Sequence, residues 1–186
     1  MQRLLRSIFP ASASNLAPQV DHLFFALLAL CGAVAFLIFV VALFFCIRYR
    51  RGSRADRTPP KINHNYVEIT WTVVPLIIFL GIFFWAAEIF FGMSRAPANA
   101  TEIYVVGKQW MWKIQHPDGR SEINELHIPV GQPVKLIMTS QDVIHDFFVP
   151  EFRTKQDVVP ARYTTEWFTP TKPGKYHIFC SQYCGT

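Results

Sequence analysis

Residues 23–47 read LFFALLALCGAVAFLIFVVALFFCI and contain no charged side chain. An α-helix rises about 1.5 Å per residue, so a helix of this length exceeds the roughly 30 Å hydrocarbon core of a bilayer. Leu, Phe, Ala and Val dominate the segment. It therefore predicts a membrane-spanning helix.

A second apolar segment predicts a second span. Residues 69–87 carry no charge, and the apolar run continues past Glu88 to Phe91. Pro75 falls near the start of this segment, where a missing backbone N–H is least costly to a helix. The alternative is a buried helix pair of a soluble protein, which two apolar runs of this length disfavour.

The excess positive charge lies entirely in the apolar half of the chain. The formal net charge is +5, with nine basic and four acidic residues in 1–100 and nine of each in 101–186. Six of the basic residues lie in 48–61, between the two spans. By the positive-inside rule this loop is cytoplasmic and the residues after the second span are external. The charge pattern thus indicates membrane topology and gives no support for nucleic-acid binding.

The external residues predict a β-sheet domain. Short segments rich in β-branched and aromatic residues alternate with turn signals such as Pro117-Asp118-Gly119 and Pro129-Val130-Gly131. Evenly spaced short strands of this kind are typical of a sandwich or barrel. The expected strands include residues 103–106, 110–114, 134–138, 164–168 and 176–179.

The four cysteines form two unlike pairs. Cys31 and Cys46 lie in the first span, where a thiol behaves as a small hydrophobic group. Cys180 and Cys184 follow the last expected strand, with His145 on an earlier segment. An external location permits a disulfide between them, although it would close only a small loop. The alternative is a soft metal site, because two thiolates and an imidazole suit copper.

Several motifs, in this order, resemble subunit II of the haem-copper cytochrome c oxidases. They are His64-x3-Glu68-x2-Trp71-Thr72-x2-Pro75 at the second span, Gln109-Trp110-Met111-Trp112, residues 142–150 (DVIHDFFVP), residues 155–162 (KQDVVPAR) and residues 173–185 (PGKYHIFCSQYCG). The resemblance implies a two-helix transmembrane hairpin followed by an all-β cupredoxin-like sandwich.

The resemblance also implies a binuclear copper centre. The thiolates of Cys180 and Cys184 would bridge two copper ions, His145 would be a terminal ligand, and the backbone carbonyl of Gln182 would be a weak axial ligand. In such a centre the cofactor carries the redox chemistry, while the protein supplies position and tuning.

The chain departs from the family pattern in two places. The family has a second His four residues after the second Cys, and a Met three residues further on. This sequence stops at Thr186, so we expect it to be a piece of a longer chain. Gln182 replaces a Glu that contributes to a magnesium site in the family. Because an amide is a weaker ligand than a carboxylate for a hard cation, the sequence does not assign magnesium.

Further roles follow from the resemblance. Trp110 would be the surface point at which electrons enter from cytochrome c, although a core position is the alternative, and on one strand it would share a face with Trp112. Glu68 would lie at the mouth of a proton-uptake path, or would simply favour the start of the helix. Asp142, Asp157 and Arg162 are candidates for docking or subunit contacts, or for ordinary solvated surface. We do not expect ligands among the remaining histidines, which are His22, His64, His116, His127 and His177.

The family implies an electron-transfer subunit that takes electrons from cytochrome c and passes them to haem in subunit I, where oxygen reduction and proton pumping occur. Its partners would be subunit I, the other oxidase subunits, cytochrome c and membrane lipid. Three other classes of protein are alternatives to this assignment. A quinol oxidase subunit II would lack the cysteines Cys180 and Cys184. A nitrogen-oxide reductase would fit the Glu68 motif less well, and a copper-delivery protein would typically carry exposed Met and His pairs.

The expected organisation has three parts in the inner membrane of a bacterium. Residues 1–21 would form an exported tail. Residues 22–96 would form the hairpin, with spans at about 23–47 and 69–91 and a cytoplasmic loop at 48–68. Residues 97–186 would form the periplasmic copper domain, incomplete at its C-terminus.

Overall fold

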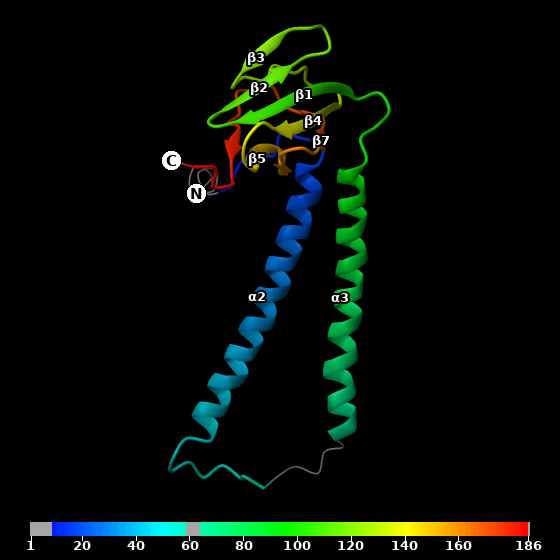
Figure 1. The fold of residues 1–186 in the computed structure, drawn as a ribbon. Helices are drawn as coiled ribbons and strands as arrows, with labels where there is room; N and C mark the ends of the chain where they lie inside the picture. Colours follow the sequence, from blue (N-terminus) through cyan, green and yellow to red (C-terminus); the bar gives the residue numbers. More distant parts are fainter. Residues whose placement is uncertain (1–8, 59–63, 186) are drawn as a thin grey trace. The chain divides into compact units, whose positions relative to one another are not determined.

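A computed structural model describes residues 9–58 and 64–185 of the chain (Figure 1). The chain divides into two compact units. One contains His22–Ala87, and the other combines the described residues up to Asp21 with those from Glu88 onward. Three of the basic residues counted above, Arg3, Arg6 and Lys61, and the last residue, Thr186, lie outside the described residues.

The described residues contain two helices long and apolar enough to cross a membrane, α2 (Ala17–Arg48) and α3 (His64–Ser94). Both have large apolar side chains on all sides, as a lipid-facing helix requires. The hydroxyl of Ser14 accepts hydrogen bonds from the N–H groups of Leu16 and Ala17, at 3.2 and 3.1 Å. These bonds satisfy two donors that the start of a helix leaves free.

Both helices are longer than the apolar segments that predicted them, because polar residues at the ends join the helical hydrogen-bond pattern. One consequence concerns Pro75. We expected it near the start of the second helix, but α3 begins at His64 and Pro75 lies inside it. A proline there cannot donate to the carbonyl four residues earlier.

The outer unit is a β-sandwich, as predicted. Among residues 101–185, one sheet has five strands in the order β3-β2-β1-β4-β7, and the other has three in the order β6-β5-β8. The β1–β4 pair is parallel and the other named pairs are antiparallel. The strands are β1 (Thr101–Lys108), β2 (Met111–Gln115), β3 (Ser121–Ile123), β4 (Val134–Ser140), β5 (His145–Val149), β6 (Thr154–Val158), β7 (Thr164–Phe168) and β8 (Phe179–Cys180), with a short 3-10 turn η1 (Pro150–Phe152).

Alternating residues of these strands form the core between the sheets. On β4 every second side chain is buried, and Phe147 of β5 and Phe168 of β7 are fully buried. Trp112 packs edge-on against Phe147, with ring centroids 5.1 Å apart. Trp110 does not share its face as expected, because it lies in the turn before β2 and is 63% exposed.

The described residues before α2 pack on the sandwich and are not a separate tail. Ala13 is fully buried in the core cluster, and its N–H donates to the carbonyl of Glu151 at 2.9 Å. The Ala13 carbonyl accepts from the N–H of Thr171 at 2.8 Å. Ser14 forms an isolated β-bridge with Pro170. This segment therefore behaves as a short additional strand of the outer unit.

Arg153 fastens this segment to the sandwich. Its side chain is 10% exposed, and its Nε donates to Asp21 Oδ1 at 2.7 Å. A terminal nitrogen donates to the carbonyl of Pro10 at 2.7 Å, and the guanidinium lies 4.7 Å from the centroid of the Phe9 ring. A planar guanidinium with five donors suits this combination of contacts.

We expect Arg153→Ala to destabilise the outer unit by about 2 to 4 kcal/mol, because it leaves Asp21 and a backbone carbonyl partly buried without their donors. Thermal unfolding of the full chain in detergent, followed by near-ultraviolet circular dichroism, measures the change. Lys135→Ala is the control, since it removes a more exposed ion pair with Glu102 and should cost less than about 1 kcal/mol. Equal losses in the two variants would contradict the proposed fastening role.

Candidate metal centre

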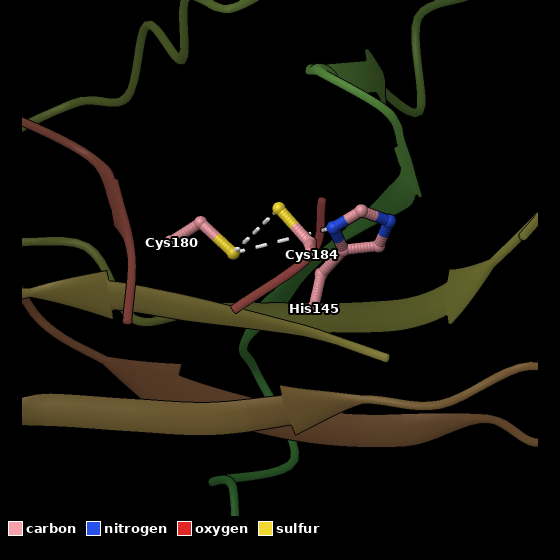
Figure 2. Close-up of side chains that lie close together, drawn as sticks. All are labelled: His145, Cys180 and Cys184. Atoms are coloured by element: carbon pink, nitrogen blue, oxygen red, sulfur yellow. Dashed lines mark hydrogen bonds between the residues drawn. The ribbon is translucent and has the colours of Figure 1, made fainter. Parts of the chain in front are cut away.

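Two neighbouring strands bring one imidazole and two thiols together. His145 is the first residue of β5, and Cys180 is the last residue of β8. These strands pair antiparallel, with Phe147 opposite Cys180. The turn after β8 then carries Cys184 back to the same place (Figure 2).

The cysteines are free thiols, so the disulfide alternative is not what the structure contains. The two Sγ atoms are 3.8 Å apart, and Cys180 Sγ lies 4.0 Å from His145 Nδ1. One ligand atom from each of the three residues lies within 4.8 Å of the others, and the described residues contain no other such group of His, Cys, Asp or Glu side chains.

These spacings and donor types fit a metal ion. Thiolates and imidazoles bind zinc at about 2.3 and 2.0 Å, so two such donors on one tetrahedral metal of this size lie roughly 3.5 to 3.8 Å apart. The 3.8 Å between the two Sγ atoms and the 4.0 Å from Cys180 Sγ to His145 Nδ1 are at or slightly above that range. Thiolate and imidazole together favour copper over hard cations. The backbone carbonyl of Gln182 also faces the cluster, since it accepts a hydrogen bond from the Cys180 thiol at 3.4 Å.

Asp142 orients the imidazole. The Nε2–H of His145 donates to Asp142 Oδ1 at 2.7 Å, so the other nitrogen, Nδ1, keeps its lone pair on the side of the thiols. A carboxylate on the far nitrogen fixes the tautomer and raises the basicity of a metal-binding histidine. His145 is 3% exposed, and its imidazole packs edge-on against the ring of Trp112.

Asp142 is itself held by backbone donors. Its carboxylate accepts from the N–H of Gln109 and from the N–H of Val143, both at 2.7 Å. The hydrogen bond from Gln109, followed by that from His145, holds the pKa of Asp142 well below its ordinary value. The carboxylate is therefore ionised and fixed in place.

Gln109 links the turn between β1 and β2 to the cysteine loop. Its side-chain amide donates to the carbonyl of Cys184 at 2.7 Å. Gly185 adopts a φ of +107°, and a Cβ there would lie 2.6 Å from Gln109 Nε2. Only glycine fits this conformation and this close approach without strain. Trp110 directly follows Gln109. It therefore lies in a turn that is bonded both to Asp142, the partner of His145, and to the backbone of Cys184.

The sequence reasoning missed two residues of this site, Gln109 and Gly107. A Cβ on Gly107 would lie 2.9 Å from Cδ2 of His145, so the glycine makes room for the buried ring. Gln109 is the first residue of the motif Gln109-Trp110-Met111-Trp112, but nothing in the sequence indicates which groups its amide would bond.

Burial raises the pKa of the Cys184 thiol, and the neighbouring Cys180 raises it further. The Cys184 thiol therefore keeps its proton in the metal-free protein near neutral pH. Since thiolate is the form that binds a metal, binding at this site must release protons.

The structure does not bring the other predicted residues into this cluster. Asp157 is exposed on β6, and Arg162 is exposed in the turn before β7. Glu68 lies in the other unit, in the second turn of α3. Among the remaining histidines, His116 and His127 bond the carboxylate of Glu122.

Two sequence profiles match the chain. The profile described as cytochrome c oxidase subunit II, periplasmic domain, matches residues 120–186, and the profile for the transmembrane domain of the same subunit matches residues 3–89.

Individual proteins agree with these matches. Cytochrome c oxidase subunit 2 of Thermostichus vulcanus is 31% identical, over 96% of this chain and 71% of the relative. The alternative cytochrome c oxidase subunit 2 of Bradyrhizobium diazoefficiens is 29% identical, over 81% of this chain and 65% of the relative. One chain of a solved haem-copper terminal oxidase dimer aligns with a TM-score of 0.51 and 20% identity, over 66% of this chain and 91% of that one, which supports the fold.

We expect Asp142→Asn to lower the affinity of the chain for copper by about 10- to 100-fold, because the imidazole loses its charged hydrogen-bond acceptor. Competition with a chelator of known affinity measures this change. Asp118→Asn is the matched control, since Asp118 is exposed and caps a hairpin turn remote in sequence from the cluster. The orienting role is wrong if both variants bind copper as the wild type does.

Proposed function

Since the chain belongs to the cytochrome c oxidase subunit II family and is a membrane protein with a periplasmic domain, we propose that it is the electron-transfer subunit of a respiratory haem-copper oxidase. It accepts electrons from cytochrome c and passes them to haem in subunit I. Oxygen reduction and proton pumping belong to subunit I, so the enzymatic activity is that of the complex.

The convergence of His145, Cys180 and Cys184 carries this proposal. The two thiolates would bridge a pair of copper ions, Nδ1 of His145 would bind one of them, and the carbonyl of Gln182 would be a weak axial ligand. When bound, the copper pair supplies storage of a single electron shared between two metals. We assign no magnesium ion, because Gln182 offers an amide and not a carboxylate.

The protein's part is to hold these donors still. His145 is fixed by Asp142 on one side, by Trp112 on another and by the close approach of Gly107. The cysteine loop is fixed by the bond from Gln109 to the Cys184 carbonyl. Ligands that cannot move keep the geometry nearly constant between redox states, so little reorganisation opposes electron transfer.

Trp110 is the proposed point of electron uptake. Its indole is 63% exposed, and the preceding residue bonds Asp142 through its backbone and Cys184 through its side chain. The exposed indole of Trp110 is thus one residue away from Gln109, which bonds both the carboxylate that orients His145 and the loop that carries Cys184. Asp142 is occupied by these bonds, which favours a positioning role over docking for that residue.

Other contacts complete the proposal. Asp157 is an exposed acidic residue that can attract a basic cytochrome c. Arg162 is proposed as part of the contact with subunit I, and Glu68 as the mouth of a proton-uptake path. The apolar surfaces of α2 and α3 would face lipid and the other oxidase subunits.

We expect Cys184→Ser to lose most of the bound copper, because a hydroxyl is a poor ligand for a soft metal and cannot replace a bridging thiolate. Copper per chain, measured by atomic absorption on protein purified from the membrane, tests this. Cys31→Ser makes the same change inside α2 and should leave copper content unaltered. Full copper content in Cys184→Ser would exclude the bridging role.

We expect Trp110→Phe to slow electron uptake from reduced cytochrome c severalfold while copper content stays at the wild-type level. The smaller ring removes part of the exposed contact surface without touching a ligand. Stopped-flow oxidation of cytochrome c by the complete oxidase measures the rate. Tyr104→Phe, on the outer face of β1, is the control, and equal rates in both variants and the wild type would remove Trp110 from the pathway.

A further inference from the structure

The last turn of α2 passes abruptly from apolar to charged residues. Phe44, Phe45 and Ile47 expose large apolar side chains, as a helix in lipid requires, and Arg48 directly follows them. Tyr49 is 42% exposed, and the centroid of its ring lies 5.9 Å from that of Phe45. Tyrosine is enriched where a membrane helix meets the lipid headgroups. The residues from Arg48 onward therefore begin at the headgroup level of the bilayer.

The chain after this boundary is strongly basic (cyan in Figure 1). Residues 48–57, which we call the arginine turn, contain five arginines, namely Arg48, Arg50, Arg51, Arg54 and Arg57. The one carboxylate in the arginine turn is that of Asp56, and it accepts hydrogen bonds from the N–H and the hydroxyl of Thr58 at 2.8 and 2.6 Å. Among the described residues, Asp56 forms no ion pair with an arginine. The arginine turn thus carries a large excess of positive charge.

Hydrogen bonds hold the arginine turn against the end of α2. The N–H of Ser53 donates to the carbonyl of Arg50 at 3.0 Å, and Gly52, just before Ser53, has the φ of +84° that such a tight turn favours in glycine. The hydroxyl of Ser53 donates to the carbonyl of Arg48 at 2.7 Å. The guanidinium of Arg57 donates to the carbonyls of Arg50 and of the residue before it, at 3.5 and 3.3 Å. The positive charges are therefore gathered at one place and do not spread along an extended chain.

Most of these guanidinium groups remain available to a ligand. In the part of the chain that the structure describes, four exposed arginine side chains have no hydrogen-bond or ion-pair partner, those of Arg48, Arg50, Arg51 and Arg54. A guanidinium presents a planar fork of donors that matches the oxygens of a phosphate group. One membrane span separates the arginine turn from the periplasmic domain, so it faces the cytoplasmic leaflet, where anionic lipids attract basic segments beside a membrane helix.

We propose that the arginine turn binds anionic phospholipids of the cytoplasmic leaflet through their phosphate groups. This inference goes beyond the proposed function and does not depend on the metal centre. Phosphatidylglycerol, which carries one net negative charge, is the probe. Phosphatidylcholine is the matched reference, because it has the same phosphodiester but no net charge. Binding at the arginine turn fixes the depth of the end of α2 in the bilayer.

The test uses the full chain in phosphatidylcholine vesicles that contain a trace of spin-labelled phosphatidylglycerol or spin-labelled phosphatidylcholine. Electron paramagnetic resonance gives the fraction of each label that the protein immobilises, and hence the relative association constant of the two lipids. We expect the wild type to prefer phosphatidylglycerol by about fivefold or more, which one basic residue near an anionic surface already supplies. The triple variant Arg50→Gln/Arg51→Gln/Arg54→Gln should bind the two lipids almost equally.

A charge-matched control separates the arginine turn from net charge. The triple variant Lys113→Gln/Lys172→Gln/Lys175→Gln removes three positive charges from exposed positions of the outer unit and should keep the wild-type preference. Protease protection of the outer unit in sealed vesicles identifies molecules that have kept their orientation. Equal lipid preference in the wild type and both variants would overturn the proposal.

A measurement on the wild type alone keeps the proposal testable if the arginine variant does not insert. Raising sodium chloride from about 20 mM to about 500 mM shortens the range of electrostatic attraction and should abolish most of the preference for phosphatidylglycerol. A preference that persists unchanged at high salt would overturn the ionic recognition proposed here. Inorganic phosphate at the same ionic strength should act no more strongly than sodium chloride, and a clearly stronger effect would indicate a site for free phosphate and overturn the assignment to lipid.

Discussion

The hydrogen bond between the imidazole of His145 and the carboxylate of Asp142 is the interaction on which the rest of the site depends. It fixes which nitrogen faces the thiols, and Asp142 can make it only because backbone N–H groups hold its carboxylate. The same carboxylate ties the turn that carries Trp110 to the start of β5. One ionised side chain therefore sets both the ligand geometry and the position of the exposed ring.

The sandwich supplies the rigidity that this arrangement needs. The pairing of β5 with β8 places Cys180 opposite Phe147, and Phe147 packs against Trp112, which in turn packs against His145. The residues before α2 complete the core from the opposite end of the sequence, through Ala13 and the Arg153 contacts. The ligand side chains lie at the edge of this close-packed interior, and the packing restricts their movement.

Much of this architecture could be predicted from local patterns. The spans followed from charge-free runs, the sandwich from regularly spaced short strands, and the ligand residues from a motif around Cys180 and Cys184. Contacts between distant segments could not be predicted. No local pattern shows that the Ala13 carbonyl accepts a hydrogen bond from the N–H of Thr171 or that the Gln109 side chain bonds the Cys184 carbonyl, because these contacts depend on strand order. Pro75 lies further inside its helix than expected, and Trp110 lies in the turn before its strand, because helix and strand boundaries depend on hydrogen bonds that composition does not reveal. The surface exposure expected of Trp110 is what the structure has.

Electron paramagnetic resonance of the chain purified from its native membrane, combined with copper quantification, tests the central claim most directly. A binuclear centre built on Cys180, Cys184 and His145 predicts two coppers per chain and a signal from one unpaired electron shared equally between them. A signal from isolated single coppers, or a chain without copper, would contradict the account.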